Sequence, residues 1–204
     1  MLFRIVLLFV FLAAPAQAAQ NILVFGDSLS AGFGLPQGAG WVDLLAQRLQ
    51  REKLAYDVVN ASISGETTLG GRNRIEAALQ EHKPAVVIVE LGANDGLRGN
   101  AVETTRANLI AIVVACHKAG AKVLLVGMRI PPNYGPVYTR RFEAMFAEVA
   151  RQQNTSLVPF MLEGFADKRD LFQADGIHPA AQAQPRILDN IYKRLRALLL
   201  PRPR

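Results

Sequence analysis

The amino-acid sequence predicts an α/β fold, a three-layer α/β/α sandwich in which helices cover both faces of a mainly parallel sheet. Short apolar runs alternate with stretches whose apolar residues recur at helical spacing, which gives five strand–helix units in order. Half of the 204 residues are apolar and 20% are charged, a balance typical of a globular chain. We therefore expect a single domain over residues 19–204.

Five segments have the composition of buried strands. The runs AVVIVEL at 85–91 and KVLLVGM at 122–128 are almost continuously apolar, as is typical of central strands in a parallel sheet. The five expected strands are 21–25, 56–59, 85–91, 122–128 and 156–160.

Helical spacing fills the intervals between these strands. Apolar residues recur three or four positions apart, as they do on the buried face of an amphipathic helix. Gly120 is expected to end the third long helix, and Pro185 is tolerable in the first turn of the last. The apolar positions are Trp41, Leu44, Leu45 and Leu49; Ile75 and Leu79; Leu109, Ile112, Val113 and Cys116; Phe142, Met145, Phe146 and Val149; and Ile187, Ile191, Leu195 and Leu198.

The first eighteen residues have the pattern of a secretory signal peptide. Arg4 gives a positive start, 5–14 is an uninterrupted apolar run, and Ala16-Gln17-Ala18 is a small-residue exit. The apolar run is too short to span a bilayer, and Ala19 stands where a lipoprotein signal needs cysteine. We expect cleavage after Ala18 and export to a periplasm or the medium.

The net charge of +6 is partly concentrated near the C-terminal end. A basic end is compatible with transient contact with an anionic membrane surface. Export and the absence of interleaved aromatic residues argue against nucleic acid, so a solvated helix face and tail are the expected role. The basic residues are Lys193, Arg194, Arg196, Arg202 and Arg204.

Cysteine and histidine usage excludes several kinds of site. A single cysteine rules out an intramolecular disulfide and a zinc site with several thiolates. Cys116 lies on an apolar helical stripe, so we expect a buried, unreactive thiol. His82 and His117 lie near expected helix ends and are interpreted as structural. No metal site is expected.

Four polar segments follow expected strands or precede the last helix. Because ligands of parallel sheets bind beyond the carboxyl ends of the strands, we expect these segments to share one crevice. The segments are Gly26-Asp27-Ser28-Leu29-Ser30, Ser62-Ile63-Ser64-Gly65-Glu66-Thr67, Gly92-Ala93-Asn94-Asp95 and Asp175-Gly176-Ile177-His178-Pro179, the last of them expected to open the final helix.

Together, these segments hold the groups needed for acyl transfer to water. Ser28 is a candidate nucleophile, His178 a base, and Asp175 a group that orients the base. The backbone N–H groups of Ser28 and Gly65 and the amide of Asn94 are candidate oxyanion donors. Taken alone, each segment is more simply explained as a turn or a helix cap, and only the catalytic interpretation explains all four at once. No Gly-x-Ser-x-Gly elbow is present, which disfavours the usual α/β-hydrolase arrangement.

The four segments resemble the conserved blocks of the SGNH (GDSL) hydrolases. The segments VVNASISGETT, VELGANDGLRG, PPNYG and DGIHP are similar, in order and spacing, to the bacterial thioesterase I, lysophospholipase and arylesterase branch. The resemblance implies a flavodoxin-like sheet of five parallel strands, no cofactor, and Ser28, Asp175 and His178 as catalytic residues. It further implies an oxyanion hole from Ser28, Gly65 and Asn94.

The expected substrates are small acyl compounds, namely aryl esters, acyl thioesters and lysophospholipids, with no obligate protein partner. The segment 129–137 follows the fourth expected strand, so Ile130 and Tyr134 are candidates to line an acyl groove; a rigid connector with Tyr134 on the surface is the alternative. Two other functions remain open: a carbohydrate acetyl esterase of the same superfamily, and a non-catalytic acyl- or lipid-binding module. Export favours esters and lysophospholipids over cytosolic thioesters.

Overall fold

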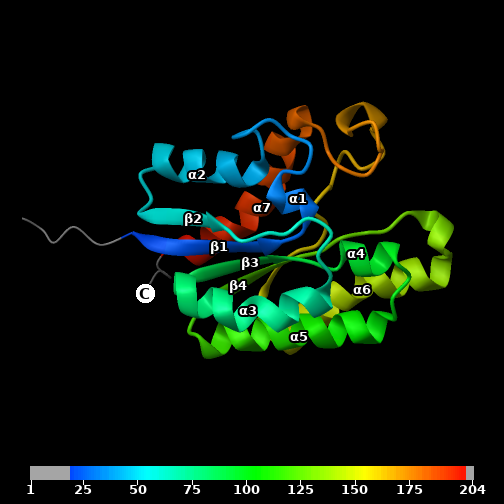
Figure 1. Ribbon diagram of the computed structural model, residues 1–204, viewed down its shortest axis with the longest axis horizontal. Coiled ribbons are helices and arrows are strands. Elements are labelled where there is room, and N and C mark those ends of the chain that lie inside the picture. Colours follow the sequence, from blue (N-terminus) through cyan, green and yellow to red (C-terminus); the bar gives the residue numbers. More distant parts are fainter. Residues whose placement is uncertain (1–18, 201–204) are drawn as a thin grey trace, which may run out of the picture.

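The expected five-stranded parallel sheet is present in a computed structural model of the protein, which describes residues 19–200. The strand order is β2-β1-β3-β4-β5, and every pair of neighbours is parallel (Figure 1). The strands are β1 (Gln20–Gly26), β2 (Tyr56–Asn60), β3 (Val86–Glu90), β4 (Lys122–Val126) and β5 (Ser156–Val158). The expected signal peptide and the last two arginines lie outside the described residues.

The last two strands end two residues earlier than their apolar runs predict. Beyond β4, Gly127 still donates its N–H to the Val158 carbonyl at 2.8 Å. A Cβ atom at Gly127 would lie 2.3 Å from the Pro159 carbonyl oxygen, so glycine is needed for the two chains to approach. Pro159 has no N–H to continue the ladder. The apolar runs therefore continue into buried loops.

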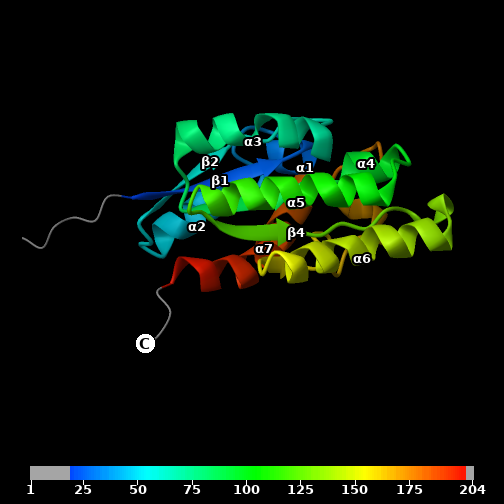
Figure 2. The ribbon, with the colours of Figure 1, turned by 90° about the horizontal axis from the view of Figure 1, so that it is seen from below.

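Helices cover both faces of the sheet, as the sequence predicts. On one face, α2 (Trp41–Arg51) packs against α7 (Gln184–Leu199), while α3 (Thr68–His82), α5 (Val102–Lys118) and α6 (Pro136–Gln152) cover the other (Figures 1 and 2). The apolar stripes that predicted these helices are buried or half-buried in the core. All five residues of β3 are buried, as expected for a central strand.

The helix-end and cysteine interpretations are confirmed. Gly120 follows α5 with a φ of 80°, a left-handed conformation that glycine adopts without strain. His82 is the last residue of α3, and His117 lies in the last turn of α5. Cys116 is completely buried, and burial raises the pKa of its thiol to about 12. The thiol is thus unreactive in the folded chain.

Two short helices, which apolar periodicity does not predict, begin where central strands end. Helix α1 (Ser28–Ala31) follows β1, and α4 (Ala93–Leu97) follows β3. The strand order reverses between β1 and β3, which makes this edge the topological switch point of the sheet. The carboxyl ends of β1, β2 and β3 therefore place their following segments side by side. None of the helices within residues 19–200 has the length and apolarity to cross a bilayer.

Candidate active site

The structure brings Ser28, His178 and Asp175 into one hydrogen-bonded chain. Ser28 is the first residue of α1, and the other two lie on the loop that precedes α7. The Nε2 atom of His178 lies 2.9 Å from Ser28 Oγ, and its Nδ1 atom lies 2.7 Å from Asp175 Oδ2. These are hydrogen-bond distances between a hydroxyl, an imidazole and a carboxylate. The three residues thus have the geometry of a nucleophile, a base and an orienting acid.

Backbone contacts hold the loop over residues 172–179, which carries Asp175 and His178. A single antiparallel bridge joins Phe172 to Pro179, and the Gln173 N–H donates to the His178 carbonyl at 2.7 Å. The sequence predicted that this segment opens the last helix, and that prediction is wrong. Helix α7 begins only at Gln184, and Asp175 caps no helix.

Asp175 is fixed by three hydrogen bonds. Its Oδ1 atom accepts from the N–H groups of Ile177 at 2.9 Å and His178 at 3.0 Å, while Oδ2 faces the imidazole. The bonds from His178, backbone and side chain, and the bond from Ile177 lower the pKa of Asp175 to about 2. Asp175 thus remains a carboxylate across the physiological pH range and favours the tautomer with hydrogen on Nδ1.

Two backbone N–H groups of the site are left without a partner by the described residues. Within residues 19–200, the N–H groups of Ser28 and Gly65 have no hydrogen-bond acceptor. Gly65 has a φ of 78°, which a side chain would strain, and no atom lies within 4 Å of where its Cβ would be. The loop is anchored on both sides, because Ile63 N–H donates to the Gly26 carbonyl at 3.0 Å and Arg98 donates to the Gly65 carbonyl at 3.0 Å.

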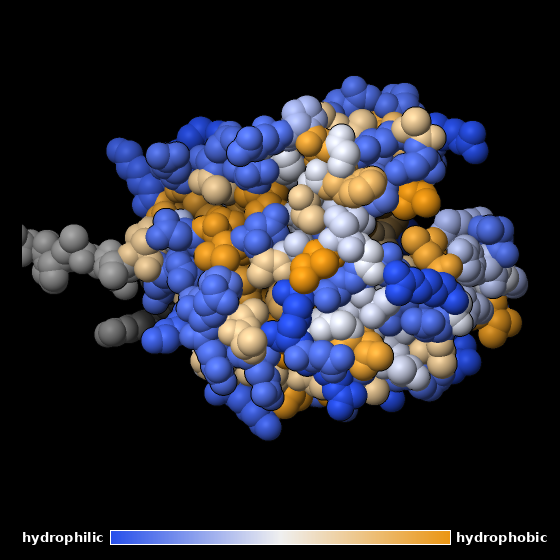
Figure 3. All heavy atoms as spheres, viewed as in Figure 1, coloured by the Kyte–Doolittle hydropathy of each residue, from blue (hydrophilic) through white to orange (hydrophobic). Residues whose placement is uncertain are grey.

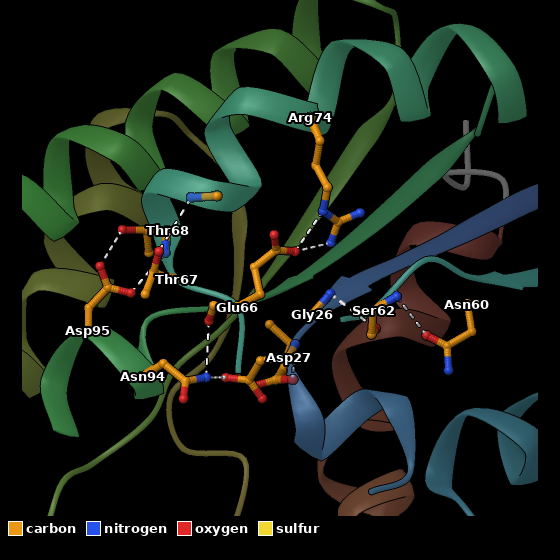
Figure 4. A network of polar contacts seen from close by, with 12 residues as sticks. Gly26, Asp27, Asn60, Ser62, Glu66, Thr67, Thr68, Arg74, Asn94 and Asp95 are labelled. Atoms are coloured by element: carbon orange, nitrogen blue, oxygen red, sulfur yellow. Dashed lines mark hydrogen bonds and ion pairs between the residues drawn. The ribbon is translucent and has the colours of Figure 1, made fainter. Parts of the chain in front are cut away.

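The Asn94 amide lies at the same place but has two partners already. Its Nδ2 atom donates to Asp27 Oδ2 and to the Glu66 carbonyl, each at 3.0 Å (Figure 4). Both partners are acceptors, so the nitrogen end of the amide must face them. The structure therefore brings together all three expected oxyanion donors, with the hydrogens of Asn94 shared rather than unpaired.

A polar network that the sequence did not reveal fastens the Gly65 loop to the sheet and to α4 (Figure 4). Glu66 pairs with Arg74 of α3, whose guanidinium lies 3.8 Å from the centre of the Phe25 ring. Asp95 accepts from Thr68 N–H at 2.8 Å and from Thr68 Oγ1 at 2.7 Å. The eight-residue spacing of Glu66 and Arg74 gave no cue, because the two meet across a loop and a helix.

Two buried acids lie beneath the Ser28 turn. Asp27 is 1% exposed and Glu90, the last residue of β3, is 2% exposed. Burial, followed by the charge of Asp27, raises the pKa of Glu90 well above its usual value. Burial raises the pKa of Asp27 to about 6, against the lowering effects of the Leu29 N–H, His178 and Asn94. Glu90 is therefore the acid of this pair that favours its neutral form, and Asp27 is mainly a carboxylate at neutral pH.

The raised pKa of Glu90 predicts a pH-dependent gain in stability for Glu90→Gln. The folded protein binds the Glu90 proton more tightly than the unfolded chain, so ionisation of the unfolded glutamate lowers the free energy of unfolding as pH rises above about 4.5. Glutamine removes this loss. One pKa unit corresponds to about 1.4 kcal/mol, and about 1 kcal/mol changes the Tm of such a domain by about 2–4 °C.

The Tm of Glu90→Gln minus that of the wild type should therefore be higher at pH 8 than at pH 5 by about 3 °C or more. Thermal unfolding followed by circular dichroism measures this difference. A difference that does not change with pH would contradict the assignment of a protonated Glu90.

Three exposed apolar side chains, which we call the apolar rim, lie on the segments that carry the site. Phe33, Ile63 and Ile177 are 51%, 51% and 53% exposed, although large apolar side chains are usually buried. The Phe33 ring lies 4.6 Å from the His178 ring, centre to centre. Figure 3 shows apolar side chains around a recess at the end of the molecule where the strands terminate. The exposed rim can therefore cover an apolar group bound at Ser28.

The enclosed space at Ser28 is small. About 150 Å³ of empty space, which includes space open to solvent, lies between α1, Phe33 and His178, below the size of sites that enclose whole ligands. Phe33 and Gln173, which donates its amide to the Phe33 carbonyl at 2.8 Å, were not identified from the sequence. The available sequence cue was a phenylalanine between Gly32 and Gly34, close after the serine.

Ile130 and Tyr134 lie beside α4 rather than in this space. Ile130 is buried against Gly96, where a Cβ atom would lie 2.7 Å from Ile130 Cγ2. The Tyr134 hydroxyl donates to the Leu97 carbonyl at 2.8 Å and fastens the 129–137 segment to α4. Their contribution to an acyl groove stays a prediction. In the part of the chain that the structure describes, no three His, Cys, Asp or Glu side chains are grouped to hold a metal ion.

Comparison with known proteins agrees with this geometry. Residues 24–185 match the model of the GDSL-like lipase/acylhydrolase family. The chain is 52% identical over 182 residues to esterase TesA of Pseudomonas aeruginosa, covering 89% of this chain and 90% of that protein. It is 42% identical over 193 residues to thioesterase 1/protease 1/lysophospholipase L1 of Escherichia coli, covering 95% and 91%.

A solved structure of TesA superposes with a TM-score of 0.86 at 51% identity, covering 88% of this chain and 99% of that one. The family match spans the carboxyl end of β1, strands β2 to β5 and all four segments around Ser28. The chain therefore belongs to the GDSL-like lipase/acylhydrolase family.

Proposed function

We propose that the protein is a serine esterase of the arylesterase and thioesterase I type, which hydrolyses carboxylic esters, acyl thioesters and lysophospholipids through an acyl-enzyme on Ser28. The observation that carries the proposal is the continuous chain from Ser28 Oγ to His178 Nε2 at 2.9 Å and from His178 Nδ1 to Asp175 at 2.7 Å. The names and the high identity of the relatives support the same activities. A non-catalytic acyl-binding module would not require Ser28, His178 and Asp175 to form a continuous hydrogen-bonded chain.

In the first step, Ser28 Oγ attacks the acyl carbonyl carbon while His178 Nε2 takes the hydroxyl proton. The carbonyl oxygen becomes an oxyanion beside the N–H groups of Ser28 and Gly65, which have no acceptor within residues 19–200, and beside the Asn94 amide. When the tetrahedral intermediate collapses, the C–O or C–S bond breaks and His178 gives its proton to the departing alcohol or thiol.

In the second step, water attacks the ester carbon of the acyl-enzyme. His178 takes a proton from the water and then returns it to Ser28 Oγ as the carboxylic acid leaves. Asp175 remains ionised throughout, because its pKa is lowered to about 2 by bonds that persist in both steps. Every proton transfer in these steps is made between substrate or water and side chains of this chain.

The acyl chain is expected to lie along the apolar rim, because the empty space of about 150 Å³ is too small to enclose a long chain. Burial of apolar area against the rim stabilises the bound acyl chain by about 25 cal/mol per Å². This gain favours acyl groups longer than acetyl. A preference restricted to acetyl esters would instead favour the carbohydrate esterase alternative.

A phosphonate reagent tests the nucleophile directly. Incubation with a fluorophosphonate should add one phosphonyl group to Ser28 and lower activity in proportion to the labelling, because within residues 19–200 only this serine is hydrogen-bonded to a histidine. Ser30 is a matched control, since it is buried and its hydroxyl donates to Glu90 at 2.6 Å. Peptide mass spectrometry locates the label. A label on Ser30, or full labelling with unchanged activity, would contradict the proposal.

Ile63→Ser tests the apolar rim. The side chain is 51% exposed, so its loss should leave the fold unchanged while removing contact with the acyl chain. We expect kcat/KM for a C8 ester to fall about fivefold to twentyfold and that for a C2 ester to change less than twofold. Steady-state rates on 4-nitrophenyl esters from C2 to C12 give the comparison.

Tyr134→Ala serves as the matched variant on the neighbouring segment. A changed chain-length profile for Tyr134→Ala alone would move the acyl groove to the α4 side, as the sequence suggested. An unchanged profile in both variants would contradict acyl binding by either segment.

We also propose that the protein is exported after cleavage behind Ala18. The support is the charged start, the short apolar run and the Ala-x-Ala exit of the sequence. Cleavage there leaves the whole of β1 in the mature chain. Export separates the enzyme from cytosolic acyl-CoA and favours esters and lysophospholipids as its substrates. Cell fractionation with N-terminal sequencing should find a protein that begins at Ala19 outside the cytoplasm.

A further inference from the structure

We propose that Asp27, backed by Glu90, is a positioning residue that turns the Asn94 amide nitrogen towards the developing oxyanion. This inference rests on the proposed oxyanion role of Asn94. It concerns a carboxyl pair that takes no part in the proton transfers between Ser28, His178 and Asp175. The two acids come from neighbouring strands, since Gly26 of β1 is in register with Glu90 of β3 and Asp27 follows directly.

The orientation of an asparagine amide decides whether it helps or harms the reaction. Its nitrogen donates hydrogen bonds, whereas its oxygen would repel an oxyanion. Asp27 precedes the nucleophile and Glu66 follows Gly65, so the two acceptors of Asn94 flank the two backbone donors. Hydrogen bonds of 3.0 Å to each hold the nitrogen between them (Figure 4). An oxyanion formed there can join as a further acceptor of the same N–H groups.

Asp27 is itself held in place from two sides. Its Oδ1 atom accepts from the Leu29 N–H at 3.0 Å, which caps α1 and aims Oδ2 at Asn94. Beneath it, Glu90 Oε2 accepts from Ser30 Oγ at 2.6 Å and lies 3.4 Å from the Asp27 N–H. A Cβ atom at Gly26 would lie 2.7 Å from Glu90 Oε2, so glycine leaves the room that this acid occupies.

Two adjacent negative charges in so dry a site would be strongly unfavourable, so one carboxyl keeps a proton. The charged or titratable groups that face Asp27 are Glu90 from β3, Asp95 from α4 and His178 from the loop before α7. A neutral Glu90 leaves the negative charge on Asp27, where it attracts the Asn94 N–H. Serving as the neutral partner is the function of Glu90 in this arrangement.

A double-mutant cycle separates this role from simple structural support. Asn94→Ala should lower kcat for 4-nitrophenyl butyrate about 10²-fold or more, the usual effect of losing an oxyanion donor. Asp27→Asn should lower kcat about 10-fold to 100-fold with KM changed less than threefold, because one amide oxygen cannot serve both Leu29 and Asn94. Added to Asn94→Ala, it should cost less than threefold. The exposed Asp43→Asn is the matched control.

Equal losses from Asp27→Asn in both backgrounds would overturn the inference, as would a kcat within threefold of wild type for Asp27→Asn alone. An unchanged kcat in Asn94→Ala would also overturn the inference, because Asn94 would then have no oxyanion role. The serine mechanism would remain intact in that case. Glu90→Gln should reduce kcat less than Glu90→Leu, because an amide can replace a neutral carboxyl group. A larger loss of kcat in Glu90→Gln than in Glu90→Leu would contradict the role of Glu90 as the neutral partner of Asp27.

A pH profile tests the same role without relying on the folding of an Asp27 variant. In the wild type, protonation of Asp27, whose pKa burial raises to about 6, should make log kcat fall more steeply towards acid pH than in Asn94→Ala, where Asp27 has no amide to orient. The slopes of the two proteins should differ by nearly one proton. Equal slopes in both proteins would contradict the positioning role.

Discussion

Replacing Ser28 with alanine is expected to lower kcat for an aryl ester by about 10⁴-fold or more, because no acyl-enzyme can form. The fold should be unaffected, since Ser28 is half-buried at the start of α1 and its side chain makes one hydrogen bond to the described residues, of 2.9 Å to the imidazole. Steady-state rates on matched esters and thioesters from C2 to C16 measure the loss. Both substrate series should lose activity together, because both use the same nucleophile.

The control for this variant is Ser64→Ala, an exposed serine on the neighbouring Gly65 loop. It should keep a rate within about twofold of the wild type, as surface substitutions usually do. Retention of more than a few per cent of the wild-type rate by Ser28→Ala would show that Ser28 is not the nucleophile. Inactivity of the wild type on every ester and thioester would revive the binding-module alternative.

Replacing Asp175 with asparagine is expected to lower kcat by about 10³-fold to 10⁴-fold while KM changes little. The reason lies in the three bonds of Asp175. The N–H groups of Ile177 and His178, at 2.9 and 3.0 Å from Oδ1, would retain the amide oxygen and direct the amide nitrogen at His178 Nδ1. Nδ1 would then have to accept a hydrogen, which places the ring hydrogen on Nε2, facing Ser28. Such a histidine cannot take the serine proton.

Asp167→Asn, an exposed substitution earlier in the same loop region, is the matched control and should leave kcat within about twofold. Circular dichroism should show the same folded structure for all three proteins. A loss of less than tenfold in Asp175→Asn would mean that another group sets the tautomer of His178. An equal loss in both variants would point to disruption of the loop rather than to the tautomer.

The fold was predicted from the sequence because its signals are local. The continuous apolar runs of β3 and β4 could belong only to strands buried on both faces, and the stripes of α2, α5, α6 and α7 have clear helical spacing. The order β2-β1-β3-β4-β5 then agrees with the resemblance that the four polar segments carry. The triad was predicted for the same reason, since its members lie in segments that follow or precede these elements.

The supports of the site were not predicted, because they depend on contacts between distant segments. Asp27 reads as an ordinary residue of a turn, and Glu90 as a polar interruption near the end of an apolar run. Only the register of β1 and β3 places them together in a dry site. Likewise, Asn94 was expected to donate to the oxyanion, and only three-dimensional structure shows that Asp27 and Glu66 already accept its hydrogens.

The short helices illustrate the same limit. Helices α1 and α4 have four and five residues, too few for an apolar stripe to reveal them. Each forms because a strand ends at the switch point of the sheet and the following segment turns sharply. These two turns position Ser28 and Asn94, so local sequence signals are weakest where the site is built.

The most direct test of the account is to trap the acyl-enzyme. The protein is mixed with a 4-nitrophenyl ester, quenched with acid within the first turnovers, and analysed by mass spectrometry. The account predicts a mass increase of one acyl group on the peptide that contains Ser28, formed at least as fast as kcat and absent from Ser28→Ala. Turnover with no acylated protein in the wild type, or an acyl group on any other residue, would contradict it.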